Sequence, residues 1–106
     1  MTGTKRAILV HAKDTVATAL EALPAGDRVR VEGVGDAPDR EIELLEPIAF
    51  GHKFALADLQ AGADVIKYGE SIGRATQSIP PGAWVHVHNI ESTRGRGDLA
   101  PSEGAA

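Results

Sequence analysis

Apolar and polar residues alternate along short stretches of the chain, which is the pattern of half-buried β-strands. The clearest stretch is RVRVEG at 28–33, and RAILVHA at 6–12 is a shorter β-rich run. EIELLEPIAF at 41–50 predicts a further strand that breaks near Pro47. VGDAPDR at 34–40 is rich in Gly, Asp and Pro, and therefore predicts the turn between two of these strands.

One segment, KDTVATALEALPAGD, follows a different period. Val16, Leu20 and Leu23 fall at helical spacing, Asp14 can cap the start of a helix, and Gly26 can end it. The hydrophobic pattern therefore predicts a fold that is mainly β with one short helix.

Three seven-residue segments share one pattern, in which an aliphatic residue, a glycine and a valine stand at positions one, four and seven. They are LPAGDRV at 23–29, LQAGADV at 59–65 and IPPGAWV at 79–85. In each we expect a buried aliphatic residue, a tight turn whose glycine takes a positive φ, and a strand whose valine points inward. The repeat favours a compact β domain with irregular turns over a sandwich of long hairpins.

The segment GAWVHVHN predicts the last strand. Side chains alternate between the two faces of a strand, so Trp84, His86 and His88 share one face, and Val85 and Val87 take the opposite face. We expect the two valines to enter the core and the two imidazoles to lie on a wetter face. That arrangement suits two ligands to one ion or two contacts to one substrate.

The composition limits the size of the core. A chain of 106 residues with 4% aromatic residues suffices for one domain with a modest core of Val, Ile, Leu and Ala. Such a core gives a low free energy of unfolding, so binding to a partner subunit, or to a second copy in a homo-oligomer, would stabilise the domain. We expect the domain to span 6–92, with a disordered leader at 1–5 and a disordered tail at 93–106.

Charge and hydropathy exclude several classes of function. The net charge is −4 and Lys and Arg do not cluster, which argues against nucleic-acid binding. No apolar run approaches the roughly 20 residues needed to cross a bilayer. The start of the chain also lacks the hydrophobic core of a signal peptide, so we expect no membrane role and a cytoplasmic location. Without cysteine, chemistry must come from His, Asp, Glu, Lys, Tyr or Ser.

Six side chains are the candidates for chemistry on residue type, because histidine binds metals and titrates near pH 7 and lysine attracts anions. They are His11, His52, Lys53, Lys67, His86 and His88. Each also fits a plain structural or solvated role, and His52 and Lys53 point opposite ways if their segment is extended. No phosphate loop, zinc-protease motif or nucleophile elbow occurs, so the chain alone lacks the pattern of a complete enzyme.

Three longer segments carry a family resemblance. ILVHAKDTVATAL, EPIAFGHKFALADLQAGADVIKYGESIGRAT and IPPGAWVHVHNIES, in this order, resemble the small SAF-type (β-clip) domain of the altronate and galactarate dehydratase family. This family also includes the small subunit of sulfolactate sulfo-lyase. The resemblance runs from about residue 6 to residue 92, and GHKFAL, KYG and HVHN are its most specific motifs.

The resemblance implies a lyase that removes water from a sugar acid such as altronate or galactarate, or sulfite from sulfolactate. It implies that this chain is a small subunit that works with a large dehydratase subunit. It also implies a divalent metal, iron(II) or else manganese or magnesium, held mainly by or together with that large subunit. The alternative is a non-catalytic SAF module that binds a sugar acid or only a protein partner.

The family's polar motif positions give the expected site residues. Four are expected to be catalytic, and two of these, His86 and His88, are also expected to bind the metal. The catalytic group is His11, Asp14, His86 and His88, and the substrate-binding group is His52, Lys53, Lys67 and Asn89. Sugar-acid members of the family often have a histidine where this chain has Trp84, so the resemblance leaves the substrate open.

Overall fold

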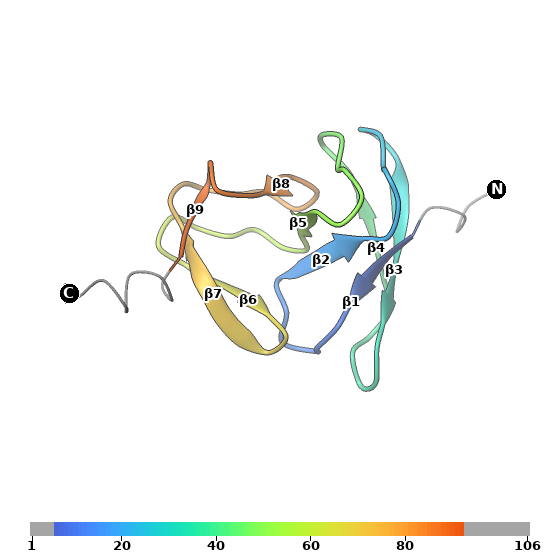
Figure 1. Cartoon of the computed structure of the whole chain (residues 1–106), viewed down its shortest axis with the longest axis horizontal. Helices are drawn as coiled ribbons and strands as arrows, with labels where there is room; N and C mark the ends of the chain where they lie inside the picture. The colour runs from blue at the N-terminus through green and yellow to red at the C-terminus, as the bar shows by residue number, and fades with distance from the viewer. Residues whose placement is uncertain (1–5, 93–106) are drawn as a thin grey trace.

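The computed structural model describes residues 6–92, and its regular structure consists of nine short β-strands (Figure 1). The strands are β1 Arg6–Leu9, β2 Val16–Ala19, β3 Arg28–Gly33, β4 Arg40–Glu43, β5 Lys53–Ala55, β6 Asp64–Lys67, β7 Glu70–Ala75, β8 Trp84–Val85 and β9 Ile90–Glu91. No helix occurs within residues 6–92, and therefore none that is long and apolar enough to span a membrane. The leader and tail predicted at 1–5 and 93–106 lie outside the described residues.

Six strands form one curled sheet in the order β4-β3-β1-β2-β5-β8, and three form a second sheet in the order β6-β7-β9. The pairing of β1 with β3 is parallel, and the other ladders are antiparallel. Figure 1 shows the β3–β4 ribbon at one end of the molecule and the β6–β7 hairpin at the other, with β2 and β5 between them. The loop from β1 to β2 passes beside the tip of that hairpin (Figure 1).

The predicted helix is wrong. The residues expected in its first turn form strand β2 instead. This strand pairs with β1 and with β5, and its Val16 and Ala17 are each 1% exposed. A helix would place Leu20 on the same face as Leu23, but Leu20 is 37% exposed while Leu23 is buried. Two long-range ladders therefore outweigh the weak helical spacing of a segment rich in Ala and Thr.

The repeated turn is confirmed in all three copies. The glycines have φ of 86°, 90° and 86°, and each donates its backbone N–H at 2.8 Å to a carbonyl of another segment. Each turn leads into a strand whose valine is 0% exposed. The glycines are Gly26, Gly62 and Gly82, and the valines are Val29, Val65 and Val85.

The structure contains a fourth copy that the valine pattern conceals. Ile48, Gly51 and Phe54 occupy the same three positions, with φ of 83° at the glycine and a fully buried phenylalanine in place of valine. The four copies pair two by two, because Leu23 bridges to Ile48 and Leu59 bridges to Ile79. The fold is therefore built from two similar pairs of turns.

Each pair of turns has its own hydrophobic core. One cluster surrounds Leu23 and Ile48, and the other surrounds Leu59 and Ile79. β5 lies between the two, since Phe54 belongs to the first cluster and the next residue along the strand belongs to the second. Alternation along one short strand thus lets it contribute to both cores.

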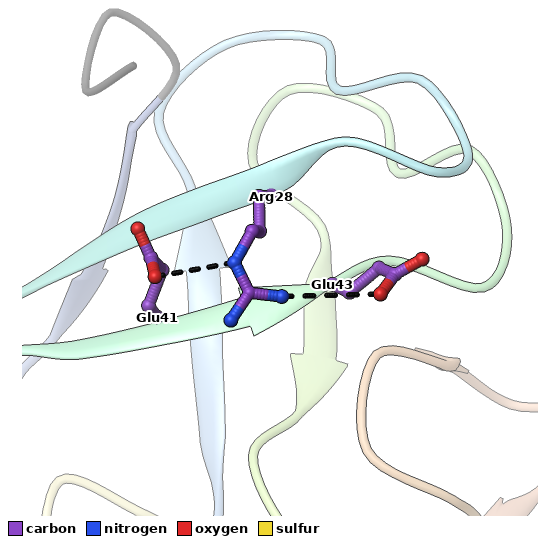
Figure 2. Close-up of polar contacts among 3 residues, drawn as sticks. All are labelled: Arg28, Glu41 and Glu43. Carbon is purple, nitrogen blue, oxygen red and sulfur yellow. Dashed lines mark hydrogen bonds and ion pairs between the residues drawn. The ribbon is translucent and has the colours of Figure 1, made fainter.

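The β3–β4 ribbon shows the predicted alternation, with inward-facing valines and charged residues facing out. β4 is an edge strand, and Arg28 on β3 pairs across the ribbon with Glu41 at 3.2 Å and with Glu43 at 3.9 Å (Figure 2). All three side chains are more than half exposed, so each pair contributes little stability. Their charges instead protect the open edge from pairing with another chain.

Candidate functional site

The histidine-rich segment is a turn rather than a strand. β8 ends at Val85, and the N–H groups of Asn89 and Ile90 both donate to the carbonyl of His86. The expectation that Val87 enters the core is wrong, because the turn leaves this side chain 80% exposed. Val85 is fully buried, as predicted.

Asn89 explains why the strand ends there. Its side chain is 3% exposed, its Oδ1 accepts the N–H of His86 at 2.9 Å, and its Nδ2 donates to the carbonyl of Trp84 at 2.7 Å. These two bonds satisfy backbone groups that a continued ladder would otherwise have paired. Asn89 thereby fixes the backbone that carries both His86 and His88.

Three imidazoles surround one indole, and we call His52, Trp84, His86 and His88 the imidazole cluster. The ring of His86 stacks on Trp84 with centroids 4.9 Å apart and planes 11° apart. The ring of His88 lies 4.9 Å from Trp84, and that of His52 lies 5.6 Å from Trp84 and 5.2 Å from His86. The structure therefore gathers three of the four predicted histidines around a residue that the prediction left without a role.

The indole also orients His52. Trp84 Nε1–H donates to His52 Nδ1 at 3.1 Å, so a neutral His52 carries its proton on Nε2. On the other side, the backbone N–H of Trp84 donates to the Glu46 carboxylate at 2.9 Å. Both rings are half-buried, and one hydrogen bond between positions 32 residues apart holds their relative orientation.

Two pockets flank this region. A largely apolar pocket of about 510 Å³ has His52 and Trp84 in its wall together with the Leu23–Ile48 pair of turns. A more polar pocket of about 310 Å³ has Glu46, His88 and Asn89 in its wall. The imidazole cluster thus lies between two hollows that differ in polarity.

A second group of predicted residues meets at the tip of the β6–β7 hairpin. Asp14 is 7% exposed, and its two carboxylate oxygens accept the N–H of Gly69 at 2.8 Å and the N–H of His11 at 3.2 Å. Lys67 and Tyr68 lie at the same tip, with the Lys67 Nζ 4.8 Å from the centre of the Tyr68 ring. We call His11, Asp14, Lys67, Tyr68 and Gly69 the hairpin-tip group.

Lys53 belongs with this second group. It pairs with Val85 on the neighbouring strand, so both face the side of the Leu59–Ile79 core, whereas His52 contacts Trp84 on the other side. Burial, and then the charge of Lys67, lower the pKa of Lys53 below its ordinary value of 10.5. The eight predicted site residues therefore separate into two groups, and β5 directs His52 toward one group and Lys53 toward the other.

The predicted metal ligands do not form a complete site within the described part of the chain. Among residues 6–92, no three His, Asp or Glu side chains converge so that they could hold a metal ion. Any metal bound through His86 and His88 would need further ligands from elsewhere.

Sequence reasoning gave no functional role to Tyr68 or to Glu46. The sequence places Tyr68 in the core or at an interface; the core placement is wrong, because the side chain is 61% exposed, and its backbone has φ of 57°. The signal was present in the sequence, because a Tyr-Gly pair between two β-rich runs occupies the place of a two-residue hairpin turn. Glu46 gave no signal, since its contact with Trp84 joins segments 38 residues apart.

The curled sheet and the glycine turns define a small β-clip domain. The family model of the altronate/galactarate dehydratase SAF domain matches residues 5–93. The chain therefore belongs to this SAF domain family.

Curated relatives agree with this assignment. Altronate dehydratase of Escherichia coli K12 is 45% identical over 85 residues, which are 80% of this chain and 16% of that protein. Altronate dehydratase of Bacillus subtilis 168 is 36% identical over 88 residues, 83% of this chain and 16% of that protein. The alpha subunit of (2R)-sulfolactate sulfo-lyase of Chromohalobacter salexigens is 46% identical over 54 residues, 51% of this chain and 57% of that subunit. The chain thus spans about a sixth of the length of the dehydratases that it matches.

Proposed function

We propose that this chain is the SAF component of a two-part lyase acting on 2-hydroxy acids. The reaction would be loss of water from a sugar acid such as altronate or galactarate, or loss of sulfite from sulfolactate. Membership of the family supports the class of reaction, since the relatives are dehydratases and sulfo-lyase subunits. The observation that carries a role for these residues is the half-exposed imidazole cluster, which the fold holds in place between two pockets.

The two candidate reactions share one chemistry. A base removes the proton from the carbon next to the carboxylate, and hydroxide or sulfite leaves from the adjacent carbon with help from an acid or Lewis acid. The resulting enol becomes a 2-oxo acid. His86 and His88 are the proposed acid and base groups, because an imidazole ring can both accept and donate a proton. His11 and Asp14 are the proposed supporting pair, and Lys53 or Lys67 would meet the acid group of the substrate.

The proposal includes a large partner, supplied by a second dehydratase-like polypeptide. The dehydratase relatives are about six times as long as the matched region, so most of each relative lies outside it. The divalent metal, iron(II) or else manganese or magnesium, belongs to the same proposal. Residues 6–92 do not make a complete site for it, so the proposal keeps two alternatives for His86 and His88: they perform the acid–base work, or they bind the metal in a ligand set that the partner completes.

The test is a reconstitution. The tagged chain is purified with its partner from its native cells, and formation of 2-oxo acid is measured with altronate, galactarate and sulfolactate. We expect activity with one of them and a loss of at least about 100-fold in His86→Ala or His88→Ala, the range for a lost acid or base group. Gln60→Ala, an exposed amide on another turn, is the control. Full activity in both histidine variants would contradict the assigned roles. If the chain binds one of these acids without turnover, it is instead a non-catalytic binding module.

A further inference from the structure

The tip of the β6–β7 hairpin has an unusual backbone. Tyr68 and Gly69 form the two-residue turn between Lys67 and Glu70, with φ of 57° and 76°. Such turns need a positive φ at both central positions and favour Asn-Gly, so a bulky aromatic residue at the first position is disfavoured. Backbone strain of this kind persists where the surroundings enforce it, and it collects at functional sites.

The surroundings do enforce it. The buried carboxylate of Asp14 accepts the N–H of Gly69 at 2.8 Å, which ties the tip to the loop before β2. The ring of His11 lies against Gly69 so closely that a Cβ atom there would be 3.0 Å from both Cδ2 and Nε2. The turn therefore needs glycine at its second position both for its φ and for the space that His11 takes.

The Tyr68 ring has no packing role that would justify this strain, since the side chain is 61% exposed. Its described contact is with the Lys67 ammonium, which lies 4.8 Å from the ring centre, within the range of a cation–π interaction. None of the ion pairs within residues 6–92 involves Lys67 or Lys53. Burial, and then the charge of Lys67, lower the pKa of Lys53, so the Lys53 ammonium lies within electrostatic reach of Lys67.

His11 adds a further donor. Its Nδ1 accepts the N–H of Lys13 at 3.1 Å, so a neutral His11 carries its proton on Nε2. The tip therefore presents an ammonium and an imidazole N–H on an exposed surface, while the carboxylate of Asp14 is occupied by two backbone N–H groups.

We propose that the hairpin tip is an anion-binding site in which Lys67 and His11 hold a carboxylate, sulfonate or sulfate group and the Tyr68 ring orients the Lys67 ammonium. Asp14 is then a positioning residue that holds the tip in place. That the bound anion is the acid group of the substrate rests on the function proposed above. The anion site itself is a property of this chain and does not need the lyase partner.

The experiment titrates sodium sulfate, with sodium chloride as the ionic-strength control, into the full chain while amide and lysine side-chain signals are followed by NMR. We expect saturable shifts at Lys67, Tyr68 and Gly69. Lys67→Gln should abolish them. Tyr68→Asn should weaken binding about two- to fivefold, the worth of an exposed cation–π contact, and should raise Tm because asparagine suits the turn.

Two controls separate the site from general electrostatics. Tyr68→Phe keeps the ring and should bind sulfate as the native chain does. Lys13→Gln removes the same charge from an exposed lysine two residues from His11 and should also bind normally. Absence of saturable shifts, or equal weakening by Lys13→Gln and Lys67→Gln, would overturn the proposal. A lower Tm in Tyr68→Asn would show that the ring is structural and would overturn its role.

The outcome is separable from that of the reconstituted lyase. Sulfate binding at the tip by a chain that supports no turnover would leave this site standing and remove the proposed reaction. Turnover in the absence of any binding at the tip would do the reverse.

Discussion

Replacing Asn89 by alanine tests whether one buried amide holds the turn that carries His86 and His88. The substitution leaves the His86 N–H and the Trp84 carbonyl without the partners that lie at 2.9 and 2.7 Å. An unsatisfied buried group costs about 1–3 kcal/mol. The turn is half-exposed, so water can replace part of the loss, and we expect about 2–4 kcal/mol of destabilisation in total. At about 4–8 °C per kcal/mol for a domain of this size, Tm should fall by roughly 10 °C or more.

Urea unfolding followed by the fluorescence of Trp84, the single tryptophan, measures this effect directly. Asn89→Asp keeps an acceptor for the His86 N–H but places a carboxylate oxygen near the Trp84 carbonyl, so we expect it to be destabilised as well. Gln60→Ala removes an exposed amide and should stay within about 0.5 kcal/mol of the native chain. If Asn89→Ala unfolds at the native midpoint, the amide does not hold the turn and its predicted role as a substrate contact gains weight.

Four further substitutions test other parts of the structure. Gly26 and Gly82 both have φ of 86°, and an alanine with this φ costs about 1–2 kcal/mol at either position. Only at Gly82 would the new Cβ also lie 2.2 Å from the Glu43 carbonyl oxygen. Gly82→Ala should therefore have the lower urea midpoint, and equal midpoints would refute the contact. Burial lowers the pKa of Lys53, so between that lowered pKa and 10.5 the unfolded chain binds more protons at this lysine than the folded chain does. The contribution of Lys53 to the free energy of unfolding therefore rises with pH in this range. Lys53→Met should be more stable at neutral pH and show a smaller rise in alkaline thermal melts; an unchanged slope would contradict this. Asp14→Asn should cost about 1–3 kcal/mol and speed amide exchange at the hairpin tip, and native exchange rates would argue against the role of the Gly69–Asp14 hydrogen bond in holding the tip.

The elements that sequence patterns predict well are those governed by local chemistry. A glycine between an aliphatic residue and an inward valine is a local signal, so three of the turns and their strands follow from sequence. The fourth copy, at Ile48, escapes the pattern only because Phe54 replaces valine. The prediction for Val16–Ala19 failed for the opposite reason, since its pairing with the preceding strand β1 and with the distant strand β5 does not show in the local hydrophobic period.

The candidate site divides in the same way. Residue type alone identifies the histidines and lysines, but the contacts that group them span long stretches of the chain. Asp14 reaches Gly69 across 55 residues, and Trp84 reaches His52 across 32. The end of β8 has a local cause, the bond from the His86 N–H to Asn89 three residues on, which an alternating pattern does not reveal.

Strand β5 explains why the GHKFAL motif contributes residues to two separate groups. His52 and Lys53 are adjacent in sequence, so the extended backbone sends them to opposite sides, one to Trp84 and the other toward the Leu59–Ile79 core. A small acid that meets the lysines and His11 therefore approaches the face opposite to the imidazole cluster. Within this chain alone, proton transfer at His86 and anion capture at Lys67 are assigned to different surfaces. One small acid cannot contact both surfaces of a single chain at once, so whichever surface binds it, the proposed partner must supply the groups that lie on the other, which makes the partner part of the active site.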